Sequence, residues 1–115
     1  MITRHMRTPI MHRAVEHAGT VYVAGVIGED LTQSMKGQTA SALAKIEKVL
    51  VEAGTGKKNL LAATLYITDM GQKNAMNEAW NEWLAPDDLP ARATIGVADL
   101  GANVLIEIVV TAAAG

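Results

Sequence analysis

The C-terminal segment 104–112, VLIEIVVTA, constrains the fold most, because its side chains alternate with a period of two. That period is typical of a β-strand, whose successive side chains point to opposite faces of a sheet. One face of this segment is wholly apolar. The other is mixed but still largely apolar, and its only charge is Glu107. The segment therefore predicts a strand whose two faces are both covered.

Further strands and two helices are predicted along the rest of the chain. Strand-like segments lie at residues 11–17, 20–27, 59–68 and 91–97, and the first two form a hairpin through Ala18-Gly19. Apolar residues at helical spacing predict a first helix that ends at Gly54 and a second that follows a capping pair, Asp69 and Gln72. The two apolar stripes are Ala42, Leu43, Ile46, Val49, Leu50 and Ala53, and then Met76, Ala79, Trp80, Trp83 and Leu84.

This order of elements predicts one α/β domain over residues 1–115 with two helices. We expect a mixed six-stranded sheet, one strand more than the five segments named above. Two strand–helix–strand crossovers predict a parallel core. Two helices are too few to cover both faces of such a sheet, and an uncovered face of this apolar character is too large a patch for a monomer. We therefore expect that face to be buried against other copies of the chain.

Two charges interrupt the apolar strands. Ala91, Ala93 and Ile95 share one side of their strand, which leaves Arg92 and Thr94 on the other side. We expect Arg92 and Glu107 to lie on the uncovered face, where copies meet, and not toward the helices. One interpretation is a structural salt bridge between subunits, since interior charges are usually paired. The other is a ligand site.

Composition argues against several classes of protein. The net charge is −2, the pI is about 5.9, and the longest basic run is Lys57-Lys58, whereas nucleic-acid binding needs a clustered cationic face. There is no cysteine, and the polar N-terminus does not resemble a signal peptide. No apolar run reaches the roughly 20 residues that span a bilayer. We expect a cytoplasmic protein with neither a nucleic-acid nor a membrane partner.

No metal site is expected from the three histidines, His5, His12 and His17, because no carboxylate completes a ligand set at metal-binding spacing. Residues 54–58, GTGKK, resemble a phosphate loop only faintly. They follow a helix and lack the strand–loop–helix context, so they are interpreted as a helix stop and a turn.

Four segments, in order, resemble the RidA/YjgF family of reactive-intermediate (enamine/imine) deaminases. In that family a P-A-R tripeptide leads into a strand, and an I-E-I segment follows fifteen residues after the arginine. The matching segments are VYVAGVIG, QTASALAKIEKVLVEAG, TLYITDM with AMNEAWNEWL, and LPARATIGVADLGANVLIEIVVTA. The resemblance implies a Bacillus chorismate mutase-like fold and a homotrimer with three clefts between subunits. In the family's strand order, residues 59–68 separate the last two strands.

The resemblance also implies roles for individual residues. Arg92 matches the arginine that binds the substrate carboxylate, and Glu107 matches the acidic residue that positions the attacking water. Asn77 and Gly25 match residues near the cleft. Thr94, beside Arg92, is a further candidate for lining it. The implied activity is hydrolysis of small 2-imino or enamine acids to 2-keto acids and ammonia, with no cofactor.

The chain departs from the family pattern at the wall of the cleft. Met11 replaces the usual tyrosine, and Ala24 and Val26 replace the serine and glutamine around the matching glycine. Thr94 replaces a common cysteine, and Val109 replaces a second glutamate. An alternative function is therefore a non-catalytic module that binds a small carboxylate ligand. A third possibility, a ribonuclease or translation inhibitor, is disfavoured by the acidic pI.

Overall fold

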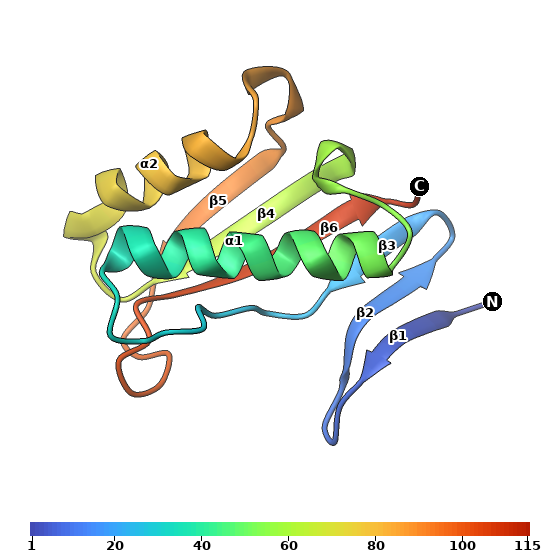
Figure 1. The fold of residues 1–115 in the computed structure, drawn as a ribbon, viewed down its shortest axis with the longest axis horizontal. Coiled ribbons are helices and arrows are strands. Elements are labelled where there is room, and N and C mark those ends of the chain that lie inside the picture. Colours follow the sequence, from blue (N-terminus) through green and yellow to red (C-terminus); the bar gives the residue numbers. More distant parts are fainter.

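A single six-stranded mixed sheet forms the centre of the computed structural model, which describes residues 1–115 (Figure 1). The strands are β1 Thr3–Arg7, β2 His12–His17, β3 Thr20–Val23, β4 Leu60–Ile67, β5 Ala91–Gly96 and β6 Ile106–Ala113. Across the sheet they lie in the order β1-β2-β3-β6-β4-β5. Only β4 and β5 pair in parallel. The prediction of a parallel core is therefore wrong, because β6 inserts between β3 and β4 and runs antiparallel to both.

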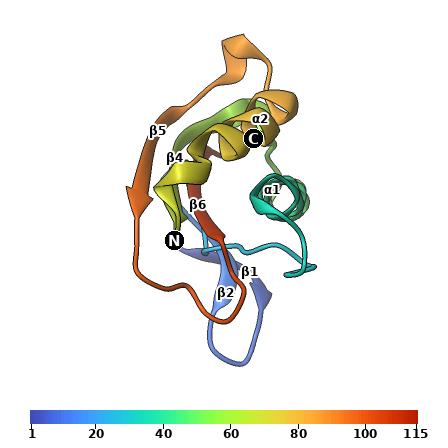
Figure 2. The same ribbon diagram turned by 90° about the vertical axis from the view of Figure 1, so that its left-hand side faces the viewer.

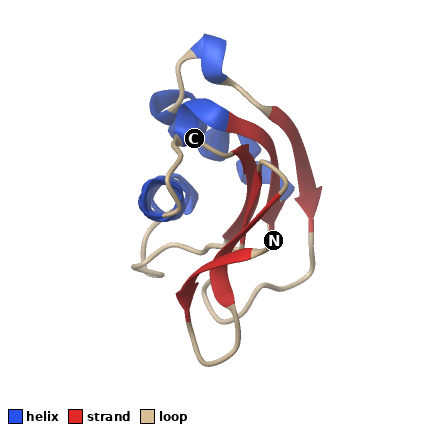
Figure 3. Cartoon of the chain, turned by 90° about the vertical axis from the view of Figure 1, so that its right-hand side faces the viewer, coloured by secondary structure: helices blue, strands red, loops and turns tan.

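Both helices lie on one face of this sheet (Figures 2 and 3). They are α1, Met35–Glu52, and α2, Lys73–Trp83. The Ser34 hydroxyl caps α1 by accepting a hydrogen bond from the backbone N–H of Gly37. After the C-cap of α1, Gly54 adopts a φ of +85°, the left-handed conformation that glycine allows at little cost. The interpretation of residues 54–58 as a helix stop is confirmed.

The hydrophobic core lies between the helices and the sheet. Every residue of the predicted α1 stripe is buried, and the α2 stripe is buried except for Trp83, which is partly exposed. The apolar face of the C-terminal strand, Val104, Ile106, Ile108, Val110 and Ala112, is also buried. Helical and strand periodicities in the sequence therefore identify the two layers correctly.

The opposite face of the sheet carries no helix, as predicted (Figure 2). Tyr22 on β3 is 52 % exposed and Ile95 on β5 is 43 % exposed. Between them β6 presents Glu107, Val109 and Thr111, which are partly exposed. We refer to this surface as the open face. It is apolar enough to favour contact with another protein surface.

The first strand is absent from the sequence prediction. Residues 3–7 are polar and have no apolar alternation, yet β1 pairs with β2 in antiparallel register from Thr3 opposite Glu16 to Arg7 opposite His12. Edge pairing depends on backbone N–H and C=O groups, which every residue except proline supplies. His5 therefore lies within a strand, and not in a lead-in segment.

Two strand-like segments, 20–27 and 59–68, depart from a strict alternation of buried and exposed side chains. A register shift between Leu60 and Ala62 buries Leu60 and leaves Leu61 49 % exposed, the reverse of the alternation in the sequence. Beyond β3 the chain leaves regular pairing, so that Val26 and not Ile27 is buried. In both places one irregular residue changes the face of those that follow.

The buried Gln38 on α1 holds two loops next to the sheet. Its side-chain amide donates to the carbonyls of Gln33 at 3.1 Å and Asn103 at 3.0 Å, and its carbonyl oxygen accepts from the Leu105 N–H at 3.0 Å. Gly28 packs against the backbone of the same residue. These contacts fix where the chain enters β6, and so they place Glu107.

Candidate functional site

Arg92 lies on the edge strand β5, on the side that faces the helices. In the parallel register it is opposite Ala63, which is buried beneath the helices, and Thr94 is opposite the buried Leu65. The prediction that Arg92 and Thr94 lie on the uncovered face is therefore wrong. Ala91 and Ala93, which the sequence pattern assigns to the core, are exposed. β5 is an edge strand, and α2 covers only one of its faces. The alternation of its apolar residues therefore does not indicate which side of the strand is buried.

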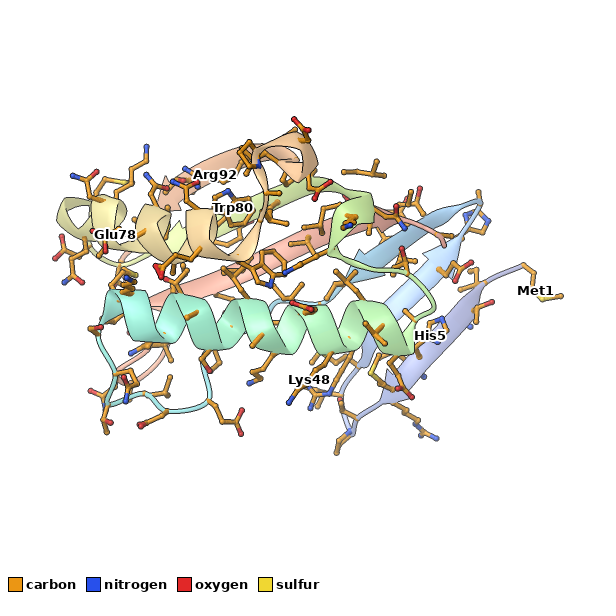
Figure 4. The ribbon with its side chains drawn as sticks, turned by 45° about the horizontal axis from the view of Figure 1, so that its top comes forward. Met1, His5, Lys48, Glu78, Trp80 and Arg92 are labelled. Carbon is orange, nitrogen blue, oxygen red and sulfur yellow. The ribbon has the colours of Figure 1, made fainter.

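The Arg92 guanidinium is not paired with any polar group of the chain. Its central carbon lies 5.3 Å from the centroid of the Trp80 ring on α2, and Figure 4 shows the two side chains together between α2 and β5. No hydrogen bond or ion pair involves this guanidinium, whereas three of the lysines form ion pairs with glutamates. Partial burial lowers the pKa of Arg92 from its usual value, although the group stays protonated. Its donors are therefore available to an anion.

A shallow pocket of about 330 Å³ opens beside this arginine. Its lining residues are Asn77, Trp80, Asn81, Leu89, Pro90 and Arg92. The Asn77 Oδ1 and the Thr94 Oγ1 are buried and have no hydrogen-bond partner. Buried polar atoms without partners are costly, and at a ligand site the ligand can supply the missing bond. We refer to Arg92, Asn77, Thr94 and Trp80 as the arginine half-site.

Glu107 lies on the open face, on the other side of the sheet. It is opposite Tyr66 of β4 in the antiparallel register, and its carboxylate rests on Gly25 so closely that a β-carbon there would collide with it. The Glu107 carboxylate forms no ion pair with Arg92 or with any other residue, so the two charges are not a salt bridge within one copy.

Met11 directly precedes β2, at the N-terminal end of that strand. The N–H of Ala24 donates to the carbonyl of Arg13 at 2.9 Å, which keeps the end of β2 beside the segment that carries Gly25. Met11 is 38 % exposed. We refer to Glu107, Gly25 and Met11 as the glutamate half-site. All members of the two half-sites except Trp80 are predicted site residues, and the structure separates them into two groups.

The two half-sites of one copy cannot hold one small ligand. Arg92 and Glu107 lie on strands that flank β4, opposite Ala63 and Tyr66. The usual spacings of 4.8 Å between strands and 3.3 Å per residue place their Cα atoms roughly 14 Å apart. Their side chains also point to opposite faces. The expectation that β4 separates the two strands is confirmed.

Three lining residues of the arginine half-site pocket are not indicated by the sequence. Asn81 follows Asn77 by one helical turn, so the two amides share one face of α2. That spacing is a signal, but it is common on exposed helices. Leu89 and Pro90 precede β5 and carry no chemical signal. Trp80 is correctly predicted as a core residue, while its contact with Arg92 depends on the register of β5.

Other kinds of site have no support in the arrangement of side chains. No three His, Asp or Glu side chains lie close enough together to hold a metal ion. Neither α1 nor α2 combines the length and the apolar character that a membrane-crossing helix needs. The two half-sites are therefore the strongest candidates for function.

Comparison with known proteins identifies a family. The family model described as Endoribonuclease L-PSP matches residues 5–114. A RutC family protein of Haemophilus ducreyi is 37 % identical over 113 residues, which cover 98 % of this chain and 97 % of that protein. The RutC family protein YoaB of Escherichia coli K12 is 35 % identical over 86 % of each chain.

Solved structures agree with these sequence relatives. NMB1025 of Neisseria meningitidis, a member of the YjgF protein family, superposes with a TM-score of 0.94 at 32 % identity, over all of this chain and 96 % of that one. Rv2704 of Mycobacterium tuberculosis has the same fold, with a TM-score of 0.89 at 24 % identity over 98 % of this chain and 99 % of that one. The protein therefore belongs to the YjgF/RidA family.

Proposed function

We propose that this protein hydrolyses small 2-imino acids, formed from enamine acids, to 2-keto acids and ammonia at a site shared by two copies of the chain. The observation that carries the proposal is a pair of unpartnered charges, Arg92 and Glu107, in half-sites that one copy holds apart. Each half-site supplies one of the two functions that the reaction needs, which are anion binding and water activation.

The arginine half-site binds the substrate carboxylate. A guanidinium offers two parallel N–H donors that match the two oxygens of a carboxylate, which fixes charge and orientation together. The unpartnered Thr94 Oγ1 and Asn77 Oδ1 nearby can complete their hydrogen bonds with the substrate or with a bound water.

The glutamate half-site orients or activates water. The Glu107 carboxylate accepts hydrogen bonds from a water molecule, which it directs at the imine carbon. The oxygen of that water forms the new C–O bond as the C=N π bond breaks and a water proton passes to the nitrogen. The carbinolamine then transfers its hydroxyl proton to the nitrogen as the C–N bond breaks, which releases ammonia and leaves the keto acid. The imine is already electrophilic, so the step needs no metal ion or organic cofactor.

We infer that the two half-sites meet when β5 and α2 of one copy pack against the open face of the next. Such a head-to-tail contact uses two different surfaces, and it forms a closed ring rather than an open filament when the rotation between copies closes. We propose a homotrimer with three equivalent clefts. The uncovered sheet face, with Tyr22 and Ile95 exposed, supports this assembly.

The alternative function is binding without turnover. Met11 and Val109 make the glutamate half-site more apolar than its counterparts in the family, which favours a ligand-binding module if the water cannot be held. The relatives described as endoribonucleases suggest RNA as a substrate. The net charge of −2 argues against that substrate, because phosphate binding depends on clustered cations.

An ammonia-release assay with an imine generated in situ tests the proposal. Wild-type protein should release ammonia and the matching keto acid. Arg92→Ala should lower kcat/KM by about 10²- to 10⁴-fold, because it removes two charge-assisted hydrogen bonds. Saturable binding of 2-ketobutyrate in calorimetry, with no ammonia release, would support the binding module instead.

A further inference from the structure

We propose that Trp80 is a positioning residue for Arg92, and that it determines how tightly the substrate carboxylate is bound. This inference rests on the proposed function of the arginine half-site. It assigns to a buried core residue a second role, which is to hold the guanidinium in a binding orientation before the ligand arrives.

The contact is specific to Trp80. Its ring is 3 % exposed and is fixed within α2, and the Arg92 guanidinium carbon lies 5.3 Å from the ring centroid. Arg92 itself is on an edge strand, where a long side chain would otherwise move freely. Because no hydrogen bond or ion pair restrains it, the ring is what orders the guanidinium in the unliganded protein.

An aromatic ring suits this task better than a carboxylate would. A cation above the face of a tryptophan is attracted to it, and the attraction grows where water is excluded. The guanidinium N–H groups project in the plane of the group, so a ring against the flat face leaves its donors free. A carboxylate would occupy those donors and compete with the ligand. Ordering the side chain in advance also reduces the entropy lost on binding.

Trp83 provides a natural comparison on the same helix. Its indole Nε1 donates to the Glu47 carboxylate at 2.9 Å, and Lys57 lies 5.5 Å from its ring centroid. These contacts join α2 to α1 and to the segment that follows α1, and Trp83 does not line the Arg92 pocket. Trp83 therefore resembles Trp80 in size, helix and cation contact, and its ring lies 6.1 Å from that of Trp80, but it does not itself contact Arg92 or line the pocket.

The test compares Trp80→Leu with Trp83→Leu, with Trp80→Phe as the conservative variant. Ammonia release gives KM and kcat for an imino acid generated in situ, and calorimetry gives the Kd of 2-ketobutyrate. Trp80→Leu should raise both KM and Kd by about 5- to 30-fold, the range of a partly desolvated cation–π contact. The kcat should stay within about threefold, because Glu107 and its water are untouched. Trp80→Phe should recover most of the binding, and Trp83→Leu should change KM less than twofold.

A second measurement follows Arg92 directly and does not depend on folding of the leucine variant. The chain has four arginines, so the Arg92 Nε–H signal can be assigned in an NMR spectrum as the one lost in Arg92→Lys. A ring close to the guanidinium shifts this signal, and Trp80→Phe should move it while Trp83→Phe should not.

Three outcomes separate the possibilities. An unchanged KM in Trp80→Leu, beside a large loss in Arg92→Ala, would overturn the role of Trp80 and leave the proposed function standing. A similar rise in KM for Trp80→Leu and Trp83→Leu would also overturn it, since the effect would then be structural. If wild-type protein neither binds 2-ketobutyrate nor releases ammonia, the proposed function fails and the role of Trp80 fails with it.

Discussion

Replacing Gly25 by alanine should remove catalysis while leaving the fold intact. The added β-carbon would overlap the Glu107 Oε2 and would lie 3.1 Å from Cδ and 3.3 Å from Cγ. The obstacle is the flexible end of a side chain, so Glu107 can rotate away at a cost of about 1 kcal/mol. Alanine also restricts the unfolded chain, which returns roughly 0.4–1 kcal/mol of stability where the backbone conformation permits it.

The two contributions nearly cancel, so the free energy of unfolding should change by less than about 1 kcal/mol and Tm by less than about 5 °C. Activity should respond differently, because the carboxylate no longer points at the water. A displaced general base costs about 10²- to 10⁴-fold in kcat. Thermal unfolding and ammonia release would be measured on the same preparation.

Gly56 is the matched control. An added β-carbon there meets no atom within 4 Å, and its φ of −165° suits alanine. Gly56→Ala should keep both Tm and kcat. A Gly25→Ala protein with wild-type kcat would refute the reasoning, because it would show that the position of the Glu107 carboxylate does not matter to the reaction.

Three further predictions concern stability, charge geometry and pH. Gln38→Leu leaves the partly buried Leu105 N–H and the Asn103 carbonyl without their side-chain partner and should lower the free energy of unfolding in urea by about 1–3 kcal/mol; an unchanged midpoint would contradict this. Arg92→Lys keeps the charge but loses the planar fork, so KM should rise at least about tenfold with little change in Tm; a wild-type KM would count against bidentate binding. Hydrogen bonds from the Thr32 hydroxyl, the Thr32 N–H and Gln33 hold the pKa of Asp30 below its usual 3.8. The ionised carboxylate therefore contributes fully to the stability of the fold above about pH 3.8. This stabilisation is lost as the pH falls through the lower pKa that Asp30 has in the folded protein. Asp30→Asn should therefore show a smaller fall of Tm on acidification, and identical acid profiles would exclude this origin.

Much of the fold could be predicted, because the spacing of apolar residues along a helix or strand indicates which side chains are buried. The stripe of α1 and the apolar face of β6 are each buried as the sequence pattern indicates. The edges of the sheet could not be predicted in the same way. β1 has no apolar pattern, and β5 has its small apolar residues on the exposed side. At the edge of a sheet, strand pairing and register determine which face of the strand is buried. The spacing of apolar residues in one sequence does not reveal that register.

For the candidate site too, the sequence identifies the residues but does not place them correctly in the fold. Resemblance selects Arg92 and Glu107. In the structure neither side chain forms an ion pair, and a pocket opens beside Arg92. The sequence places them on one face, and the structure places them on opposite faces. That difference arises because the edge strand β5 turns Arg92 and Thr94 toward the helices and leaves its small apolar residues exposed. It changes the hypothesis from a site on one surface to a site that needs two surfaces.

Mixing two inactive variants tests this two-copy site most directly. Arg92→Ala and Glu107→Ala should each be inactive alone. When they are co-expressed or refolded together from urea, about one site in four should join an intact Arg92 from one copy to an intact Glu107 from another, because each cleft takes its two halves from different copies. Ammonia release should then recover to about a quarter of the wild-type value, as that ratio requires. Mixed assemblies that stay as inactive as the separate variants would contradict a catalytic site shared between copies.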